Sequence, residues 1–248
     1  MAVDRRARSG LEIEDAGGDR SWLRRSSLAY HTAFDLCAAE ASREAGPVAV
    51  LASSPFYARE LARRLSGEVL LHFAHAEGLT EPAIRAAMGP EVDWGRMRLV
   101  SAWERSKEDC PHMVLWAEPE KQTCEDTLNA VQQLAPSAGR ILILGTTRLR
   151  RLLPEWQSAD SPPARAPLGS MRPIVRALRD LGYAVEGAYG FHGPLSLLWG
   201  TASRLPAALG RDDLVDRCFA AMRQAYLVRG WQARWAPVWV VAGRREVD

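Results

Sequence analysis

Residues Val48 to Leu65 read VAVLASSPFYARELARRL, and this stretch decides the fold. Its first five residues, 48–52, are all apolar and predict a buried strand, while the spacing of apolar and charged residues over 55–65 predicts an amphipathic helix. A buried strand that runs directly into a helix is the repeating unit of a parallel α/β sheet. The connection between them contains no glycine, although a glycine-rich turn is what usually lets the backbone approach a bound nucleotide.

The alternation of apolar runs and helical patterns continues along the chain. Further strands are predicted at 68–73, 97–102, 113–117, 140–144, 183–189 and 237–242, and further helices at 22–45, 81–88, 123–134 and 170–181. Such an alternation predicts an α/β protein with a mostly parallel sheet that helices cover on both faces. In a sheet of this kind, a ligand binds at the carboxyl ends of the strands.

Length and periodicity indicate one domain with an insertion. Residues 1–19 lack apolar periodicity and are predicted to form a flexible tail. A single domain is then expected over 20–248, because 248 residues suit one large α/β unit. A second helical pattern before the last predicted strand indicates a helical insertion at about 191–234, whose apolar stripe is typical of core packing.

Charge and cysteine content limit the class of protein. The net charge is +2, from 32 basic and 30 acidic residues, so no global field indicates nucleic acid or a membrane surface as a partner. The four cysteines form no CxxC pair, and no signal-like apolar segment stands at the N-terminus. These features favour free thiols and a cytoplasmic location.

Three later segments resemble class I S-adenosylmethionine-dependent methyltransferases. Residues Leu134 to Leu144, LAPSAGRILIL, are similar to the turn and fifth strand of that family. Leu178 to Gly190, LRDLGYAVEGAYG, resembles its helix, glycine and sixth strand, and Ala236 to Arg245, APVWVVAGRR, resembles its final antiparallel strand. The resemblance implies a doubly wound, mostly parallel seven-stranded sheet, the Rossmann-like methyltransferase fold, with an antiparallel last strand and a late helical insertion.

The cofactor motif of that family is degenerate in this chain. The family's first motif resembles Val-Leu-Asp-x-Gly-x-Gly-x-Gly, and an alignment on the helix at 58–65 places Ala49 at the acidic position and Leu51, Ser53 and Pro55 at the glycines. A side chain at a glycine position restricts the backbone angles and fills space near the ligand. The acid expected near the end of the second strand is replaced by the sequence LHF at 71–73.

Four residues are candidates for contact with S-adenosylmethionine if it binds: Ser53, Ser54, Phe56 and Trp103. Ser54 also suits the N-cap of the following helix, with Pro55 at its first position. Trp103 suits either stacking on a base or packing inside the protein. The sequence favours the absence of a cofactor, with S-adenosylmethionine as the alternative.

Glu118 and His192 are the candidate catalytic residues. Glu118 follows the fourth predicted strand, where its carboxylate would accept a proton or contact a substrate amine; it also suits the N-terminus of the next helix. His192 lies in the apolar stretch GFHGPLSLLWG, residues 190–200. Its imidazole suits either a catalytic base or a side chain packed inside the protein. His72, His75 and Glu77 suit a polar loop better than a metal site, and no metal is predicted.

Taken with the damaged motif, these features favour a methyltransferase-fold pseudoenzyme, a non-catalytic binding or partner subunit. The alternative is an active S-adenosylmethionine-dependent methyltransferase with a rearranged cofactor loop that acts on a small molecule. A protein partner, a second copy of the chain or a small-molecule ligand is expected, and neither nucleic acid nor a membrane is indicated.

Overall fold

The computed structural model describes residues 27–44, 46–52, 55–73, 80–100, 113–117, 138–147, 149 and 171–245. The predicted tail at 1–19 and the predicted helix at 123–134 lie outside these residues. None of the described helices is long and apolar enough to cross a lipid bilayer.

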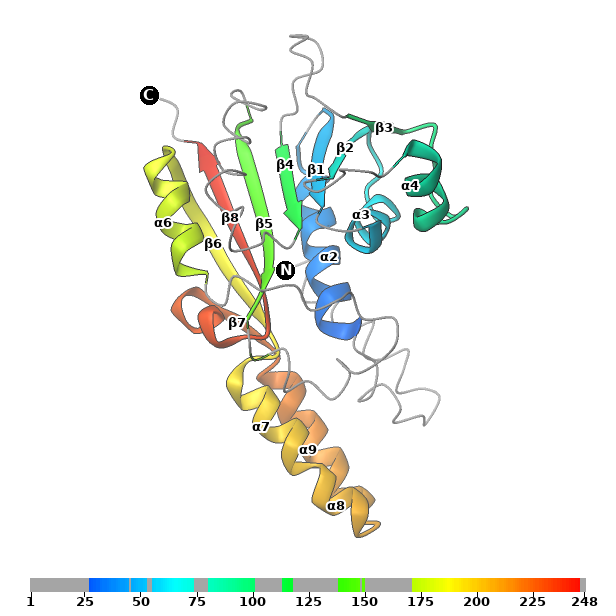
Figure 1. Cartoon of the computed structure of the whole chain (residues 1–248). Coiled ribbons are helices and arrows are strands. Elements are labelled where there is room, and N and C mark those ends of the chain that lie inside the picture. The colour runs from blue at the N-terminus through cyan, green and yellow to red at the C-terminus, as the bar shows by residue number, and fades with distance from the viewer. Residues whose placement is uncertain are drawn as a thin grey trace.

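An eight-stranded sheet forms the centre of the molecule, in the order β3-β2-β1-β4-β5-β8-β6-β7 (Figure 1). Neighbours among β1 to β5 pair in parallel, and β8 lies antiparallel between β5 and β6. The predicted α/β class with a mostly parallel sheet and an antiparallel last strand is confirmed. The strands are β1 (Val48–Ala52), β2 (Val69–Phe73), β3 (Met97–Leu99), β4 (Met113–Ala117), β5 (Arg140–Thr146), β6 (Tyr183–Phe191), β7 (Leu227–Arg229) and β8 (Val238–Arg245).

The sheet has one strand more than the predicted seven. The additional strand, β7, pairs antiparallel with the end of β6 and forms one edge of the sheet. Three residues are too few to give a period of two in the sequence, so β7 is defined by its partner strand and not by its own pattern. Pairing also extends β5 beyond the predicted end at Leu144. Its last two residues, Gly145 and Thr146, pair with Trp239 and Val238 of β8.

Helices cover both faces of the sheet, as the alternation predicts. Val48, Val50 and Ala52 of β1 pack on one face with α2 and α3. Ala49 and Leu51 pack on the other face, which α6 covers. Successive side chains of a strand point to opposite faces, so the all-apolar strand β1 is explained by burial on both sides. The helices on the sheet are α2 (Ser27–Ala41), α3 (Pro55–Ala62), α4 (Glu81–Met88) and α6 (Arg172–Asp180).

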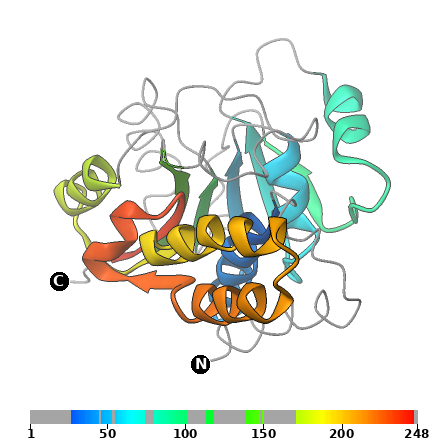
Figure 2. The ribbon, with the colours of Figure 1, turned by 90° about the horizontal axis from the view of Figure 1, so that it is seen from below.

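Between β6 and β8 the chain forms a helical hairpin that extends from one end of the sheet (Figures 1 and 2). Two of its helices, α7 and α9, lie side by side in both views and pack together. The chain then returns through β7 and a short 3-10 helix, η5, to the start of β8. The elements of this region are α7 (Pro194–Ala202), α8 (Arg204–Ala208), α9 (Asp212–Gln224) and η5 (Gly230–Trp235).

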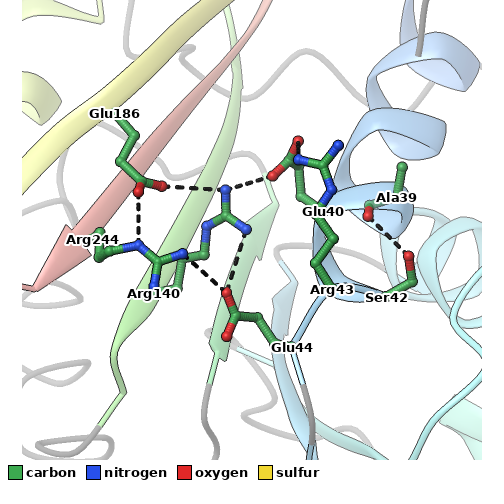
Figure 3. Close-up of polar contacts among 8 residues, drawn as sticks. All are labelled: Ala39, Glu40, Ser42, Arg43, Glu44, Arg140, Glu186 and Arg244. Atoms are coloured by element: carbon green, nitrogen blue, oxygen red, sulfur yellow. Dashed lines mark hydrogen bonds and ion pairs between the residues drawn. The ribbon is translucent and has the colours of Figure 1, made fainter. Parts of the chain in front are cut away.

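A buried ion network joins α2 to the amino-terminal edge of β5 (Figure 3). The side chain of Arg140 is 9% exposed and contacts the carboxylates of Glu40, Glu44 and Glu186. Arg244, directly opposite Arg140 on β8, donates to Glu186 at 2.7 Å and to Glu44 at 3.3 Å. Two facing arginines would repel each other, but the shared carboxylates turn this cross-strand pair into a network.

Glu186 reaches both arginines because β6 is irregular at this point. The register of β6 against β8 shifts between Val185 and Gly187, so Glu186 is the extra residue of a β-bulge. A bulge redirects a side chain and increases the local twist of the strand. Here it supplies the carboxylate that links β6 to Arg140 of β5 across β8.

The opposite end of β5 is fixed by a close contact between a glycine and an indole. Gly145 lies beside Trp239, the largest of the fully buried side chains. A β-carbon built on Gly145 would stand 2.3 Å from Cζ2 of the indole, so no side chain fits at this position. The indole therefore occupies the space that the absent side chain of Gly145 leaves.

Replacing Arg140 with methionine is expected to lower the free energy of unfolding by about 3 kcal/mol, because the buried carboxylate of Glu40 loses Arg140 and retains the more exposed Arg43. Arg244→Met, which changes a half-exposed member of the same network, should cost below about 1 kcal/mol. Urea denaturation of the two variants and the wild type measures both values. If both variants lost the same free energy of unfolding, the burial of Arg140 would not be what makes its ion pairs more stabilising than those of Arg244.

Gly145→Ala is expected to destabilise the protein by about 1–3 kcal/mol, because Trp239 is enclosed and has no room to move. Gly139→Ala is the matched control, since within the described part of the chain no atom beyond the adjacent residues lies within 4 Å of the β-carbon it would add. Its effect should stay within about 0.5 kcal/mol. Thermal and urea unfolding of both variants test the contact. A Gly145→Ala protein as stable as the wild type would contradict it.

Candidate functional site

The carboxyl ends of the parallel strands meet at one edge of the sheet. The register places Ala52 of β1 beside Ala117 of β4, and Ala117 beside Leu144 of β5. Since β8 is antiparallel to both β5 and β6, the end of β6 at Phe191 reaches the same edge as the end of β5. This edge is where a ligand of a doubly wound sheet binds.

The connection from β1 to α3 is short. β1 ends at Ala52 and α3 begins at Pro55, so only two residues separate the strand from the helix. Ala49 and Leu51, which align with the acid and the first glycine of the family motif, are buried within β1 and pair with β2. Of the four aligned motif positions, Ala49 and Leu51 are therefore strand, Pro55 is the first residue of α3, and Ser53 lies outside the described residues.

Most of the predicted cofactor contacts are not placed. Ser53, Ser54 and Trp103 lie outside the described residues, and so does Glu118, one of the two predicted catalytic residues. Phe56 belongs to α3, but its side chain is not described. These assignments remain predictions, and the arrangement of Glu118 relative to His192 is likewise not placed.

The end of β2 carries no acid within the described residues. Phe73 is buried in the core, and the ring Nδ1 of His72 lies 2.9 Å from the carbonyl oxygen of Val100, which follows β3. His72 thus holds the chain after β3 against β2. His75 and Glu77 lie outside the described residues, and among the residues placed by the structure no group of three or more His, Cys, Asp or Glu side chains suits a metal ion.

Backbone contacts fill the edge between β5 and β8. The N–H of Thr147 donates to the carbonyl of Pro237 at 2.8 Å, and its hydroxyl donates to the carbonyl of Ala236 at 3.1 Å. The same hydroxyl accepts from the N–H of Leu149 at 3.2 Å. Sequence reasoning missed Thr147, because its partners lie far along the chain, just before β8.

His192 lies directly after β6 and is buried. Its backbone has φ 58°, in the left-handed region that few non-glycine residues adopt. The ring Nδ1 lies 3.2 Å from the hydroxyl oxygen of Ser196, and the ring meets the edge of Tyr226 at a centroid distance of 4.5 Å. The sequence pointed to His192 but not to these two partners, of which Ser196 stands one helical turn later in the same apolar stretch.

The environment of His192 decides its protonation. Burial lowers the pKa of its imidazole from 6.5 to about 4, because the charged form loses its hydration. The ring is therefore neutral near pH 7, and with this pKa it is a weak proton acceptor. A role for His192 as a catalytic base stays a prediction.

Neither of the two cysteines that the structure describes, Cys37 and Cys218, is an exposed nucleophile. Cys37 of α2 is buried, and its burial, together with the charge of Glu40, raises the pKa of the thiol to about 12. The thiol stays protonated, and a protonated thiol is a poor nucleophile. Cys218 is buried as well, and Cys110 and Cys124 lie outside the described residues.

No protein-family model matches the sequence, and no curated protein matches it. Solved structures match its fold. The [4+2]-cyclase SpnF is 10% identical and has a TM-score of 0.50, and the match covers 88% of this chain and 81% of that one. Magnesium protoporphyrin IX methyltransferase from Synechocystis PCC 6803, with bound S-adenosylhomocysteine, is 11% identical with a TM-score of 0.46 and coverages of 88% and 84%.

A third similar structure is an S-adenosylmethionine-dependent methyltransferase from Geobacter sulfurreducens in complex with S-adenosylhomocysteine. It is 14% identical with a TM-score of 0.43, and the match covers 86% of this chain and 90% of that one. At such identities the likeness concerns the fold. The match to SpnF, at a TM-score of 0.50, therefore concerns the arrangement of helices and strands and not an activity.

Acidification is expected to lower the stability of the folded protein through the buried imidazole of His192. Below pH 6.5 the unfolded chain takes up a proton on this residue, whereas the folded protein does so only near pH 4. Stability is therefore lost as the pH falls from about 6.5 to about 4, by about 3 kcal/mol in total from this group. His192→Asn should remove that part of the pH dependence, since asparagine tolerates a positive φ and has no imidazole.

Urea denaturation of the wild type and His192→Asn across this pH range measures the difference. Other groups titrate in both proteins, so the difference between the two curves isolates His192. Parallel curves would contradict a buried neutral imidazole at this position.

Proposed function

We propose that the chain is a methyltransferase-fold protein whose usual cofactor site is degenerate and that it acts as a non-catalytic binding or partner subunit. The observation that carries this proposal is the two-residue connection between Ala52 and Pro55. A glycine-rich loop binds a cofactor by bringing bare backbone close to it. Two residues after an uninterrupted buried strand leave little chain with which to build such a loop.

The surroundings of this connection support the same proposal. The described residues at the end of β2 include no carboxylate for a ribose, and His72 is engaged with the backbone at Val100. Between β5 and β8 the edge is closed by the hydrogen bonds of Thr147. These contacts support the proposal of a degenerate cofactor site, and no reaction step through S-adenosylmethionine is assigned to the described residues.

The helical hairpin supports a role in binding a partner. In the described part of the chain, every large apolar side chain with high exposure belongs to the region between β6 and β8. Clustered exposed apolar side chains are typical of surfaces that another molecule covers. Five of them lie on the hairpin, Leu195, Leu198, Trp199, Leu205 and Leu209, and the other two, Trp231 and Trp235, lie on η5.

An active methyltransferase that acts on a small molecule through a rearranged cofactor loop is the second candidate. It is favoured by the similar structures that are described with S-adenosylhomocysteine, which make S-adenosylmethionine the first ligand to test. SpnF, described as a [4+2]-cyclase, indicates that a fold of this kind does not by itself specify methyl transfer. If the second candidate holds, Glu118 or His192 would accept the proton of the substrate.

Isothermal titration of the full chain with S-adenosylmethionine and S-adenosylhomocysteine separates the candidates. We expect no saturable binding at ligand concentrations up to about 1 mM. A Kd above this concentration corresponds to a binding free energy weaker than about −4 kcal/mol. A cooperative unfolding transition of the same sample is the control for a folded protein. Stoichiometric micromolar binding would overturn the proposal, and transfer of a labelled methyl group that Glu118→Gln abolishes would establish the enzyme.

A further inference from the structure

A groove lies between α6 and η5, on the face of the sheet opposite α2 and α3. It encloses about 480 Å³, a volume typical of sites for small ligands. Its apolar lining consists of Met171, the residue before α6, Val175 of α6 and the indole of Trp231. Both α6 and η5 contact β6, which β4, β5 and β8 separate from β1, so the groove is distinct from the predicted cofactor site.

Arginines dominate the polar lining of the groove. Arg172, Arg176 and Arg179 follow one another at helical spacing along one flank of α6, and Arg234 of η5 faces them. The carboxylate in the lining, that of Asp180, lies 3.9 Å from Arg176, and both side chains are highly exposed. Such a pair is weak in water, so it does not cancel the positive charge of the groove.

Two of these arginines have no carboxylate partner within the described part of the chain, Arg179 and Arg234. The Nε of Arg234 is buried and has no hydrogen-bond partner there. Its guanidinium instead lies 5.3 Å from the ring centroid of Trp231 and 4.9 Å from that of Trp235. These cation–π contacts hold the charge at the wall of the groove.

Trp231 adds an aromatic surface to this cationic site. Its indole lines the groove and is 66% exposed, although a tryptophan usually buries most of its surface. Guanidinium groups bind phosphate through paired hydrogen bonds, and an exposed indole stacks on a planar base. A ligand that satisfies both features carries a planar ring and a negatively charged group a short distance away.

We propose that this groove binds a nucleoside phosphate, with the base stacked on Trp231 and the phosphate held by Arg176 and Arg179. The ligand is either a free mononucleotide or a nucleotide within a single-stranded nucleic acid, because both present the same chemistry. The net charge of +2 for the whole chain does not reveal such a site, since it averages the groove with the rest of the surface. The site requires no cofactor at the end of β1 and so extends beyond the function proposed above.

Binding to the full chain is measured with two probes at low salt: adenosine monophosphate by calorimetry, and a fluorescein-labelled single-stranded RNA oligonucleotide by anisotropy. We expect saturable binding of at least one probe that weakens as salt is added. Arg176→Glu combined with Arg179→Glu should weaken it more than tenfold, and Trp231→Ala about tenfold. Arg204→Glu, the same substitution at one exposed site on α8 outside the groove, should have no effect.

Competition then identifies the source of the nucleotide. Displacement of the oligonucleotide by adenosine monophosphate shows that a mononucleotide is sufficient, and binding of the oligonucleotide without such displacement assigns the site to single-stranded nucleic acid. Absence of binding by both probes would overturn the proposal. Equal affinity of the wild type and Trp231→Ala, with displacement by inorganic polyphosphate, would also overturn it, because the groove would then be a non-specific anion surface.

Discussion

The arrangement of the sheet depends on the ion pairs that the buried guanidinium of Arg140 forms. A charge in this position is tolerated only when carboxylates surround it, and these come from α2, from the turn that follows α2 and from the bulge of β6. Two of these carboxylates, those of Glu44 and Glu186, also hold Arg244 of β8. One cation therefore fixes the position of a helix and of two strands that are remote from it in sequence, and it does so at the edge of the sheet opposite the candidate site.

The two edges of the sheet thus have different chemistry. At the amino-terminal edge of β5, charges are paired in a network whose centre, Arg140 with Glu40, is buried (Figure 3). At the carboxyl edge, the described groups are occupied by contacts within the protein: Thr147 with the chain before β8, and His192 with Ser196 and Tyr226. The ion network can hold the fold together while residues at the carboxyl edge change, because fold and function depend on different residues.

Long apolar runs and local helix signals made much of the fold predictable. β1, β4 and α4 have the predicted boundaries, because an apolar run or a Thr-Glu-Pro start specifies each of them locally. β7 and the bulge at Glu186 could not be predicted, because each exists only through its pairing with another strand. The partners of Arg140 were hidden for the same reason, since Glu40 precedes it by 100 residues.

The candidate site was less predictable than the fold. The sequence pointed to His192 as a titratable group in an apolar stretch, but its protonation follows from burial, which depends on Tyr226 and the return of the chain. The arginines of α6 and the pair Trp231 and Arg234 are each visible as local patterns. Their common groove is visible only in three dimensions, because it requires η5 to lie against α6.

The position of β8 has a consequence for the order in which the protein folds. β5 and β6 do not pair with each other, and each completes its hydrogen bonds only when β8 is inserted between them. During synthesis, both strands and the whole helical hairpin are made before β8 is available. Until then, the edges of β5 and β6 that β8 will cover remain unpaired. An unpaired strand edge can pair with another chain, so the nascent protein is exposed to aggregation until β8 is inserted.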